Sequence, residues 1–311
     1  MATSPPLVLK PFIGRLGNQI FQWASAYGLA RKHNASLCIE SSRGWTADIV
    51  PHFVGPFDEC SAWQSSLKRC SLAAAGAPCV HQYSEQGPHR FDNLPVREPY
   101  VRFINAFLAS YRYFEGVETE VRQRLQFRPH IRAAARANVA RSPCIRAHPS
   151  AALVGVHVRR TDRLGLGVWP NITYFRNAMA HFRAKHAARG ACFVIESDDV
   201  RWCHQQGVFR ASDVHIDNET RRAVSLAVLG RCQDHILSVG TFGWWGAWLG
   251  RAKRGSTTVY FAQEDIGQRD YRPLRAWIKN QHERAGTAAP TLLPRGVLRD
   301  YFPPEWLPFD N

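Results

Sequence analysis

The chain has 311 residues, of which 45% are hydrophobic and 12% aromatic, so it can bury a core and is not intrinsically disordered. Forty Lys and Arg against 25 Asp and Glu give a formal net charge of +15, but the basic residues are scattered and no long block of like charges occurs. The sequence therefore does not indicate a nucleic-acid-binding protein, which needs a concentrated basic stripe or a recognisable module.

The chain begins with the pattern of an α/β sheet. Residues 7–13 predict a strand, residues 20–33 an amphipathic helix and residues 36–40 a second strand, with the glycine turn GRLGNQ at 14–19 between the first two. The order strand, turn, helix, strand is typical of a parallel sheet. Residues 41–100 predict mixed loops, and further helices are predicted over 100–115, 119–125 and 130–150.

A second α/β run follows the loop SPCIRAHPS at 142–150, where we place a domain boundary. Strands are predicted at 152–157, 191–196, 214–216, 235–239 and 257–261, with helices at 171–189, 200–207, 221–232 and after 240. Two α/β halves, 1–150 and 151–311, predict two Rossmann-like lobes with parallel sheets that face a cleft. Ligands in such sheets bind at the carboxyl ends of the strands.

The cysteines and the hydropathy set further expectations. Eight cysteines occur without a CxxC pair, which disfavours a zinc ribbon. One disulfide among Cys60, Cys70 and Cys79 is plausible in an oxidising compartment, whereas Cys192 and Cys232 lie in apolar stretches typical of inert core thiols. No transmembrane helix or signal peptide is recognisable, so the chain is expected to be soluble unless an anchor is missing from the sequence.

The stretch VGVHVRRTD at 154–162 places charged residues directly after an apolar strand. Arginine's planar fork matches phosphate oxygens, so a diphosphate suits two adjacent arginines. Because side chains alternate along a strand, His157 and Arg159 are expected to point one way and Arg160 the other. One arginine then contacts the ligand and the other holds the loop through Asp162. The alternative is an internal Arg–Asp pair with no ligand.

Three other stretches follow predicted strands. Gly14 and Gly17 allow a tight turn, and Asn18 and Gln19 suit sugar hydroxyls or a phosphate oxygen, or simply cap a helix. In TFGWWGAWL, Ser238 and Thr241 flank a helix N-terminus that offers free N–H groups to an anion, whereas core packing is expected for the three tryptophans Trp244, Trp245 and Trp248. In ESDD, Asp198 or Asp199 accepts from a ribose or a base, or caps a helix.

Other chemistries lack their motifs. The sequence contains no HExxH, no GxSxG and no DxD, the last being the pattern by which many sugar-transferring enzymes hold a divalent metal. We therefore expect no metal site.

The ordered set of stretches resembles glycosyltransferase family 11, the galactoside α-1,2-fucosyltransferases. The stretches that carry the resemblance are GRLGNQIFQWA (14–24), ASYRYFEG (109–116), VGVHVRRTD (154–162), FVIESDDVRWC (193–203) and SVGTFGWWGAWL (238–249). The resemblance implies a two-lobed GT-B fold. It also implies inverting, metal-independent and cofactor-free transfer of L-fucose from GDP-fucose to the 2-hydroxyl of a galactose-terminated glycan.

The resemblance also implies roles for matching residues. The family's H-x-R-R-x-D donor motif falls on His157, Arg159, Arg160 and Asp162, with an arginine on the diphosphate. Donor-side positions near the nucleotide fall on Ser238, Thr241 and Phe242, and the cleft loop of the other, acceptor-side lobe on Gly14, Gly17, Asn18 and Gln19. Arg159 and Asp162 are the catalytic candidates, although an arginine already competes for Asp162, so no general base is assigned.

Two departures leave alternatives open. Ser225 stands where the family often has an acidic residue, seven positions before Cys232, which fits a homologue that binds GDP-sugars or carbohydrates without catalysis. The arginine motif is shared with α-1,6- and protein O-fucosyltransferases, so another linkage is the second alternative. Family habit places the protein in the Golgi lumen or at its membrane, whereas the chain itself shows no anchor.

Overall fold

The computed structural model describes residues 7–9, 14–39, 49–57, 81–83, 91, 101–103, 107–164, 169–250, 255–261 and 298–309. The chain divides into two compact units, and each contains a parallel sheet. Unit 1 consists of Met1–Gln126 and Trp277–Pro303, and unit 2 of Phe127–Ala276 and Pro304–Asn311. The predicted α/β class with parallel sheets is confirmed.

Unit 1 holds a four-stranded sheet in the order β2-β1-β4-β3, in which every pair is parallel. Its strands are β1 (Leu7–Leu9), β2 (Leu37–Ile39), β3 (His81–Tyr83) and β4 (Val101–Phe103). Helix α1 (Leu16–Lys32) connects β1 to β2 and is buried along most of its length. The 3-10 helix η2 (Tyr111–Tyr113), α4 (Glu118–Arg124) and α12 (Leu298–Tyr301) complete the described part of the unit.

Unit 2 holds a six-stranded parallel sheet in the order β10-β9-β8-β5-β6-β7. Its strands are β5 (Ala152–Val158), β6 (Ala191–Ser197), β7 (Val214–Ile216), β8 (Asp234–Leu237), β9 (Thr258–Phe261) and β10 (Leu307–Phe309). Its α-helices are α5 (Pro129–Arg141), α6 (Pro143–Ala147), α7 (Ile172–Lys185), α8 (Val200–Gln205), α9 (Arg222–Arg231) and α10 (Thr241–Gly250), and a 3-10 helix η4 (Gly207–Arg210) follows α8.

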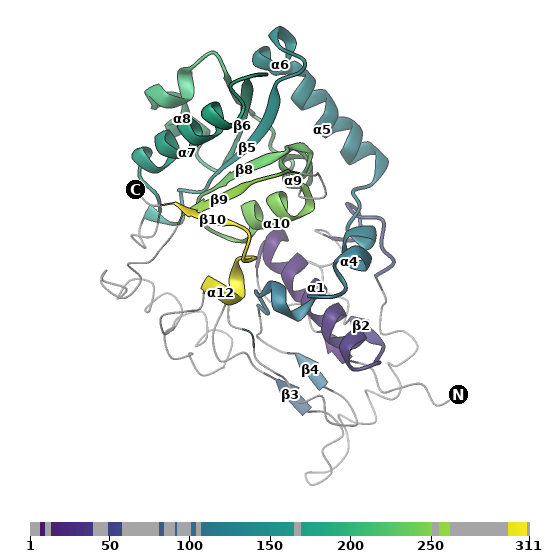
Figure 1. Ribbon diagram of the computed structural model, residues 1–311. Helices are drawn as coiled ribbons and strands as arrows, with labels where there is room; N and C mark the ends of the chain where they lie inside the picture. Colours follow the sequence, from purple (N-terminus) through teal and green to yellow (C-terminus); the bar gives the residue numbers. More distant parts are fainter. Residues whose placement is uncertain are drawn as a thin grey trace. The chain divides into compact units, whose positions relative to one another are not determined.

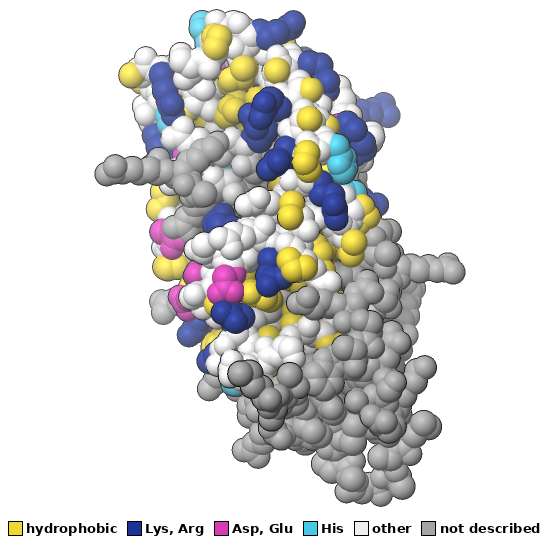
Figure 2. Space-filling model, turned by 90° about the vertical axis from the view of Figure 1, so that its right-hand side faces the viewer, with side chains coloured by type: hydrophobic (Ala, Val, Ile, Leu, Met, Phe, Trp, Pro, Cys, Tyr) yellow, Lys and Arg dark blue, Asp and Glu magenta, His cyan; other side chains and the backbone are white. Residues whose placement is uncertain are grey.

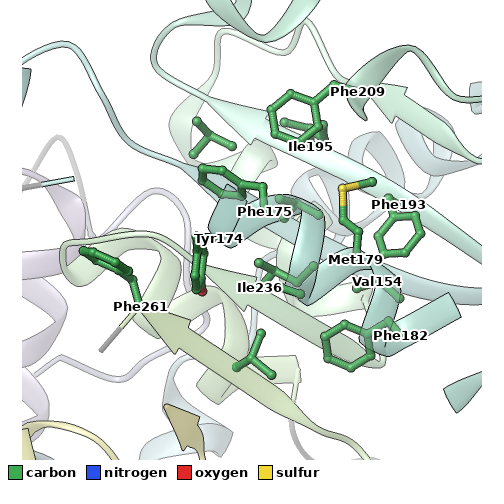
Figure 3. Close-up of a cluster of buried hydrophobic side chains, with 14 of the residues drawn as sticks. Val154, Tyr174, Phe175, Met179, Phe182, Phe193, Ile195, Phe209, Ile236 and Phe261 are labelled. Carbon is green, nitrogen blue, oxygen red and sulfur yellow. The ribbon is translucent and has the colours of Figure 1, made fainter. Parts of the chain in front are cut away.

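Helices cover both faces of this sheet (Figure 1). On one face, strand residues such as Val154 and Phe193 pack against Phe175, Met179 and Phe182 of α7 (Figure 3). On the other face, α9 lies between α5 and the strands. A strand buried on both faces must be apolar almost throughout, which is why the runs at 152–158 and 191–197 were recognisable in the sequence.

The structure differs from the sequence prediction at three places. The expected boundary near residue 150 falls inside unit 2, because α5 packs its apolar side against α9. The helix predicted over 100–115 is wrong: β4 pairs with β1 and β3, and the described residues 107–115 contain a 3-10 turn and no α-helix. Sheet pairing decided the outcome there, and aromatic residues suit strands well.

The third difference concerns the cysteines. Cys192 is not a free core thiol, because it forms a disulfide with Cys144. Cys38 is also disulfide-bonded, whereas Cys232 is free and buried as predicted. The predicted disulfide among Cys60, Cys70 and Cys79 lies outside the described residues.

Candidate functional site

The strand order of unit 2 reverses at one place, between β5 and β8. From β5 the chain builds outward through β6 and β7, and it then returns to the other side of β5 with β8, β9 and β10. The helices that follow β5 and β8 therefore leave in opposite directions, and the carboxyl ends of these two strands are where open α/β sheets bind ligands. His157 is the penultimate residue of β5 and Arg159 directly follows that strand. Ser238 directly follows β8.

Ser238 fastens the two strand ends to each other. Its backbone N–H donates to the carbonyl of His157 at 3.1 Å, and its hydroxyl oxygen accepts from the backbone N–H of Arg159 at 2.9 Å. The same hydroxyl lies 3.3 Å from Nδ1 of His157. Ser238 therefore lies beside the arginine motif, and its hydroxyl serves the protein backbone. The predicted position of Ser238 near a nucleotide stays a prediction.

His157 is held neutral in this position. Burial, with a smaller contribution from the charge of Arg159, lowers the pKa of His157 to about 4. The ring lies beside that of Phe242, with 5.7 Å between the centroids. Gly243 makes this approach possible, since a Cβ at that position would lie 2.4 Å from Nδ1. The helix after β8 is therefore packed closely onto the end of β5.

Arg159 forms an internal pair with Asp162. Its Nε donates to Oδ1 of Asp162 at 2.9 Å, and a second guanidinium nitrogen donates to Oδ2. The arginine side chain is 16% exposed and that of Asp162 39% exposed, so the pair lies at the edge of solvent. The guanidinium also lies beside Gly240, which has φ +94°. An anion that reaches this edge has to displace the Asp162 carboxylate to take up the paired hydrogen bonds of the guanidinium.

Arg160 points elsewhere, as strand alternation predicted. Its guanidinium lies over the rings of Trp169 and Trp202, at 5.2 and 4.8 Å from the centroids, and donates to Asp199 at 2.8 Å. Asp199 also caps α8 by accepting from the N–H of Trp202 at 3.0 Å. One of the two arginines was expected to pair with Asp162, and the structure shows that this arginine is Arg159. Arg160 is fixed by Asp199.

Asp198 fixes the loop after β5. One carboxylate oxygen accepts from the backbone N–H of Arg160 at 2.8 Å, and the other from the hydroxyl of Thr161 at 2.7 Å. With both oxygens bonded within the protein, Asp198 shapes the arginine loop. The predicted contact of Asp198 with a ribose or a base stays a prediction.

The N-terminus of α10 supplies the other polar feature of this edge. Thr241 and Phe242 lie in its first turn, which contains no acidic side chain, so no carboxylate of this turn neutralises the positive end of the helix dipole. The three tryptophans Trp244, Trp245 and Trp248 are buried and pack against one another, as predicted. They anchor the helix whose first turn lies beside His157.

The predicted glycine loop belongs to unit 1, whereas the site above belongs to unit 2. Gly14 adopts φ +153° and accepts from the side-chain amide of Gln19 at 3.1 Å, and the N–H of Asn18 donates to Arg15 at 2.9 Å. Gly17 is buried in the first turn of α1. These hydrogen bonds all lie within residues 14–19, so they stabilise the N-terminus of α1 and the turn before it.

Glu196 is a candidate residue that the sequence analysis did not select. It pairs in register with His157, so both side chains lie on the α9 side of the sheet at neighbouring strand ends. Glu196 is 3% exposed, and burial followed by the nearby Asp217 carboxylate raises its pKa well above the usual range. Its Oε1 is buried with no hydrogen-bond partner, which is costly for a polar atom.

Ser225 lies next to this carboxyl. Its hydroxyl donates to the carbonyl of Glu219 at 3.4 Å. Ser225 also partly offsets the rise in the pKa of Glu196 that burial causes. Asp217 in turn accepts from Asn138 at 3.0 Å. The carboxyl of Glu196 on β6 thus lies beside Ser225 of α9, the position at which the resemblance led us to expect an acidic residue. A lone Glu at the end of an apolar strand was the available sequence signal.

Within the ranges that the structure describes, no group of three or more His, Cys, Asp or Glu side chains is placed to hold a metal ion. The same residues include no helix that is both long and apolar enough to cross a membrane.

Comparison with known proteins identifies the family. Residues 89–278 match the model of Glycosyl transferase family 11. The chain belongs to glycosyltransferase family 11. Curated relatives include galactoside alpha-(1,2)-fucosyltransferase 1 of Bos taurus, 28% identical over 266 residues that cover 80% of this chain and 67% of the relative. Galactoside alpha-(1,2)-fucosyltransferase 2 of Sus scrofa is 27% identical over 266 residues, covering 80% and 70%.

The chain spans about two thirds of the length of the curated relatives it matches. Solved structures with a similar fold include a mutant of Arabidopsis thaliana FUT1 in complex with GDP, with a TM-score of 0.52 and 12% identity over 83% of this chain and 70% of that one. POFUT1 in complex with GDP gives 0.50 and 12% over 83% and 99%. The fucosyltransferase NodZ from Bradyrhizobium gives 0.50 and 14% over 84% and 96%. These structural similarities confirm that the chain has an α/β fold with parallel sheets.

Proposed function

We propose that this protein is a fucosyltransferase that takes L-fucose from GDP-fucose and transfers it to the 2-hydroxyl of a galactose in a glycan. The observation that carries the proposal is the bidentate guanidinium of Arg159 at the reversal point of the unit 2 sheet, beside the first turn of α10. Membership of family 11 and the names of the curated relatives support fucosyl transfer and the α-1,2 linkage.

In this proposal the donor diphosphate displaces Asp162 from Arg159. A diphosphate carries more charge than a carboxylate and accepts the same paired hydrogen bonds, so the exchange is favourable. Arg160 stays fixed between Trp169 and Trp202 and adds a second positive charge. With the N–H groups of α10, these charges stabilise GDP as it departs.

The transfer step then balances as follows. The acceptor hydroxyl oxygen forms a bond to the anomeric carbon, and the bond from that carbon to the β-phosphate oxygen breaks with inversion. The hydroxyl proton has to pass to a base. We propose Asp162 for this role, because the exchange that binds the diphosphate releases its carboxylate at a solvent-accessible position.

We further propose that Glu196 recognises the guanine base. Guanine presents an N1–H and a 2-amino group side by side, and both are donors. The unpartnered Oε1 of Glu196 is an acceptor on the same sheet face as His157. In this role Glu196 takes the place of an acidic side chain on α9, where the chain has Ser225.

We propose a GT-B arrangement in which units 1 and 2 form the two lobes, with the glycine loop of unit 1 on the acceptor side. We also propose the Golgi lumen as the compartment. The Cys144–Cys192 disulfide supports an oxidising environment. Asn34, Asn171 and Asn218, which start N-x-S/T sequons, are exposed.

Calorimetric titration of the purified chain tests the donor site. GDP and GDP-fucose are compared with UDP and GMP, with and without EDTA, in the native chain and in Arg159→Ala. Binding of GDP that EDTA does not change and that Arg159→Ala abolishes supports the proposal. A folded protein that ignores GDP contradicts it and favours a homologue without donor binding.

Transfer is then measured on β-galactosides, and the linkage of the product is read by NMR. A 1,2-linkage supports the proposal. A 1,6-linkage, or transfer to a protein hydroxyl alone, retains the donor assignment and replaces the acceptor. Binding of GDP-fucose without transfer to any acceptor favours a homologue that has lost catalysis.

A further inference from the structure

The segment that contains α5 and α6 has an unusual charge pattern. No Asp or Glu occurs between Glu120 and Asp162, while arginines recur throughout that interval. Because they are spaced apart, the sequence shows no block of like charge. The structure exposes the members that lie in unit 2 on α5 and α6, and we call them the α5 basic face: Arg132, Arg136, Arg141 and Arg146, with His130 and His148.

The packing of α5 explains this exposure. The helix buries Ile131, Ala135 and Val139 in a cluster with α9, and Asn138 is buried as well. Most of its other positions are exposed to solvent. Arg132 and Arg136 are one helical turn apart and lie side by side, an arrangement of like charges that costs helix stability. Lys and Arg side chains spread over the upper part of the surface in Figure 2, on the side of the molecule where Figure 1 places α5 and α6.

Neighbouring carboxylates do not neutralise this face. Asp217 and Glu219 both accept hydrogen bonds from Asn138, and Glu219 is also held by Arg221, which lowers the pKa of Glu219 to about 2. Within the part of unit 2 that the structure describes, Arg132, Arg136 and Arg146 form no ion pair. The face therefore presents uncompensated positive charge.

The shape of the face indicates the kind of partner. The exposed positions between its arginines on α5 are Ala133, Ala137 and Ala140, so small side chains separate the charges. A pocket lies at the C-terminal end of α5, where Arg141 lines it together with Asp217 and Glu219. Single-stranded polyanions are usually bound in grooves with aromatic platforms, and the exposed positions of α5 and α6 include no aromatic residue. Among the described residues, the large apolar side chains that are exposed are Val54, Leu164 and Leu307, so α5 and α6 have no anchor for insertion into lipid.

We propose that the α5 basic face docks on the surface of an anionic phospholipid bilayer. Guanidinium groups pair with lipid phosphates through two hydrogen bonds, and α5, with 13 residues and a length of about 20 Å, lies along the plane of the headgroups. Attraction is electrostatic and needs no apolar insertion. The docking does not depend on which sugar the enzyme transfers.

Vesicle flotation of the full chain tests this proposal. The probes are vesicles of phosphatidylcholine with phosphatidylserine and vesicles of phosphatidylcholine alone. We expect binding to the anionic vesicles only, weakened by salt. Each arginine near such a surface contributes about fivefold, so Arg132→Gln with Arg136→Gln is expected to weaken binding about 10-fold or more.

The matched control replaces Arg176 and Arg201 with Gln, which removes the same charge from exposed positions on α7 and α8, across the sheet from α5. This control is expected to retain most of the binding. Equal losses of vesicle binding in the two double variants would show that the net charge of the protein, and not the α5 basic face, causes the binding. Failure to bind anionic vesicles overturns the proposal. If the protein then binds heparin in the same buffer, the face is assigned to a polyanionic chain instead.

Thermal denaturation separates loss of binding from loss of fold. Because Arg132 and Arg136 repel each other, their replacement is expected to leave the melting temperature unchanged or slightly higher. A double variant with a lower melting temperature is replaced by Arg146→Gln, which lies outside α5, and the same loss of vesicle binding is then required of it.

Discussion

The guanidinium of Arg159 holds both carboxylate oxygens of Asp162, three residues later in the chain. Because the pair lies at the carboxyl end of β5 and remains partly exposed, it is a preformed anion site occupied by the protein's own carboxylate. An incoming diphosphate has to compete with that carboxylate.

Asp162→Asn removes the competitor and keeps the shape. We expect GDP to bind about 3- to 10-fold more tightly, because a neutral amide holds Arg159 less strongly than a carboxylate does. Transfer of fucose is expected to fall by about 100-fold, since an amide cannot accept the hydroxyl proton. Calorimetry and steady-state kinetics measure the two effects. Weaker GDP binding in this variant would show that Asp162 positions Arg159 and does not compete for it.

Arg160→Lys preserves the positive charge but loses the planar contact with Trp169 and Trp202. We expect a loss of about 1–2 kcal/mol in the free energy of unfolding, together with weaker GDP binding, because Asp199 loses its best partner near the start of α8. Chemical denaturation measures the first quantity and titration the second. Arg201→Lys, which is exposed on the same helix, is the control and is expected to behave as the native chain. Full stability in Arg160→Lys contradicts the prediction.

Glu196→Gln tests base recognition. The amide keeps one acceptor but presents an N–H group to guanine donors, so we expect GDP affinity to fall about 10-fold or more. Inosine diphosphate lacks the 2-amino group, so it should bind the native chain more weakly than GDP does. In the variant, the two nucleotides should bind with about equal affinity.

The raised pKa of Glu196 adds a pH dependence. If the ionised carboxyl binds the base, GDP binding tightens as pH rises through that raised pKa, and Glu196→Gln removes the trend. Equal discrimination between GDP and inosine diphosphate in both proteins would remove Glu196 from base recognition.

His157 makes a prediction about stability. Its pKa is about 4 in the folded protein and 6.5 in a model peptide. Between these two pH values, His157 is therefore protonated in the unfolded chain and neutral in the folded chain. Stability is therefore lost as pH falls from about 6.5 to about 4, by at most about 3 kcal/mol. Denaturant titrations across this range compare the native chain with His157→Gln, and the difference between their curves should shrink at low pH. Parallel curves would show that His157 is not buried in the neutral form.

The sequence predicted the elements of unit 2 well because its strands are buried on both faces. Residues 152–156 of β5 and 191–195 of β6 are apolar throughout, and the polar and charged residues that follow them marked the carboxyl edge of the sheet. Strand order is a different matter. Nothing local shows that β8 lies beside β5, so the contact of Ser238 with Arg159 needed the structure.

Other features left little trace in the sequence. Cys144 and Cys192 are 48 residues apart, and their pairing depends on α6 lying near the start of β6. The sequence did not show which arginine pairs with Asp162, and nothing in it linked Asp199 to Arg160. Alternation along β5 turns Arg160 to the face on which Trp169, Trp202 and Asp199 lie. Glu196 was hidden because its significance depends on a missing hydrogen bond, which is a three-dimensional property.

The last strand of unit 2 has a consequence for synthesis on the ribosome. β10 pairs with β9, and Trp306 packs against Trp244, yet these residues follow a segment that belongs to unit 1. Until residues 304–309 have left the exit tunnel, β9 presents an open edge, which invites pairing with other chains. Unit 2 thus cannot complete its sheet before the last segment of unit 1 has been translated.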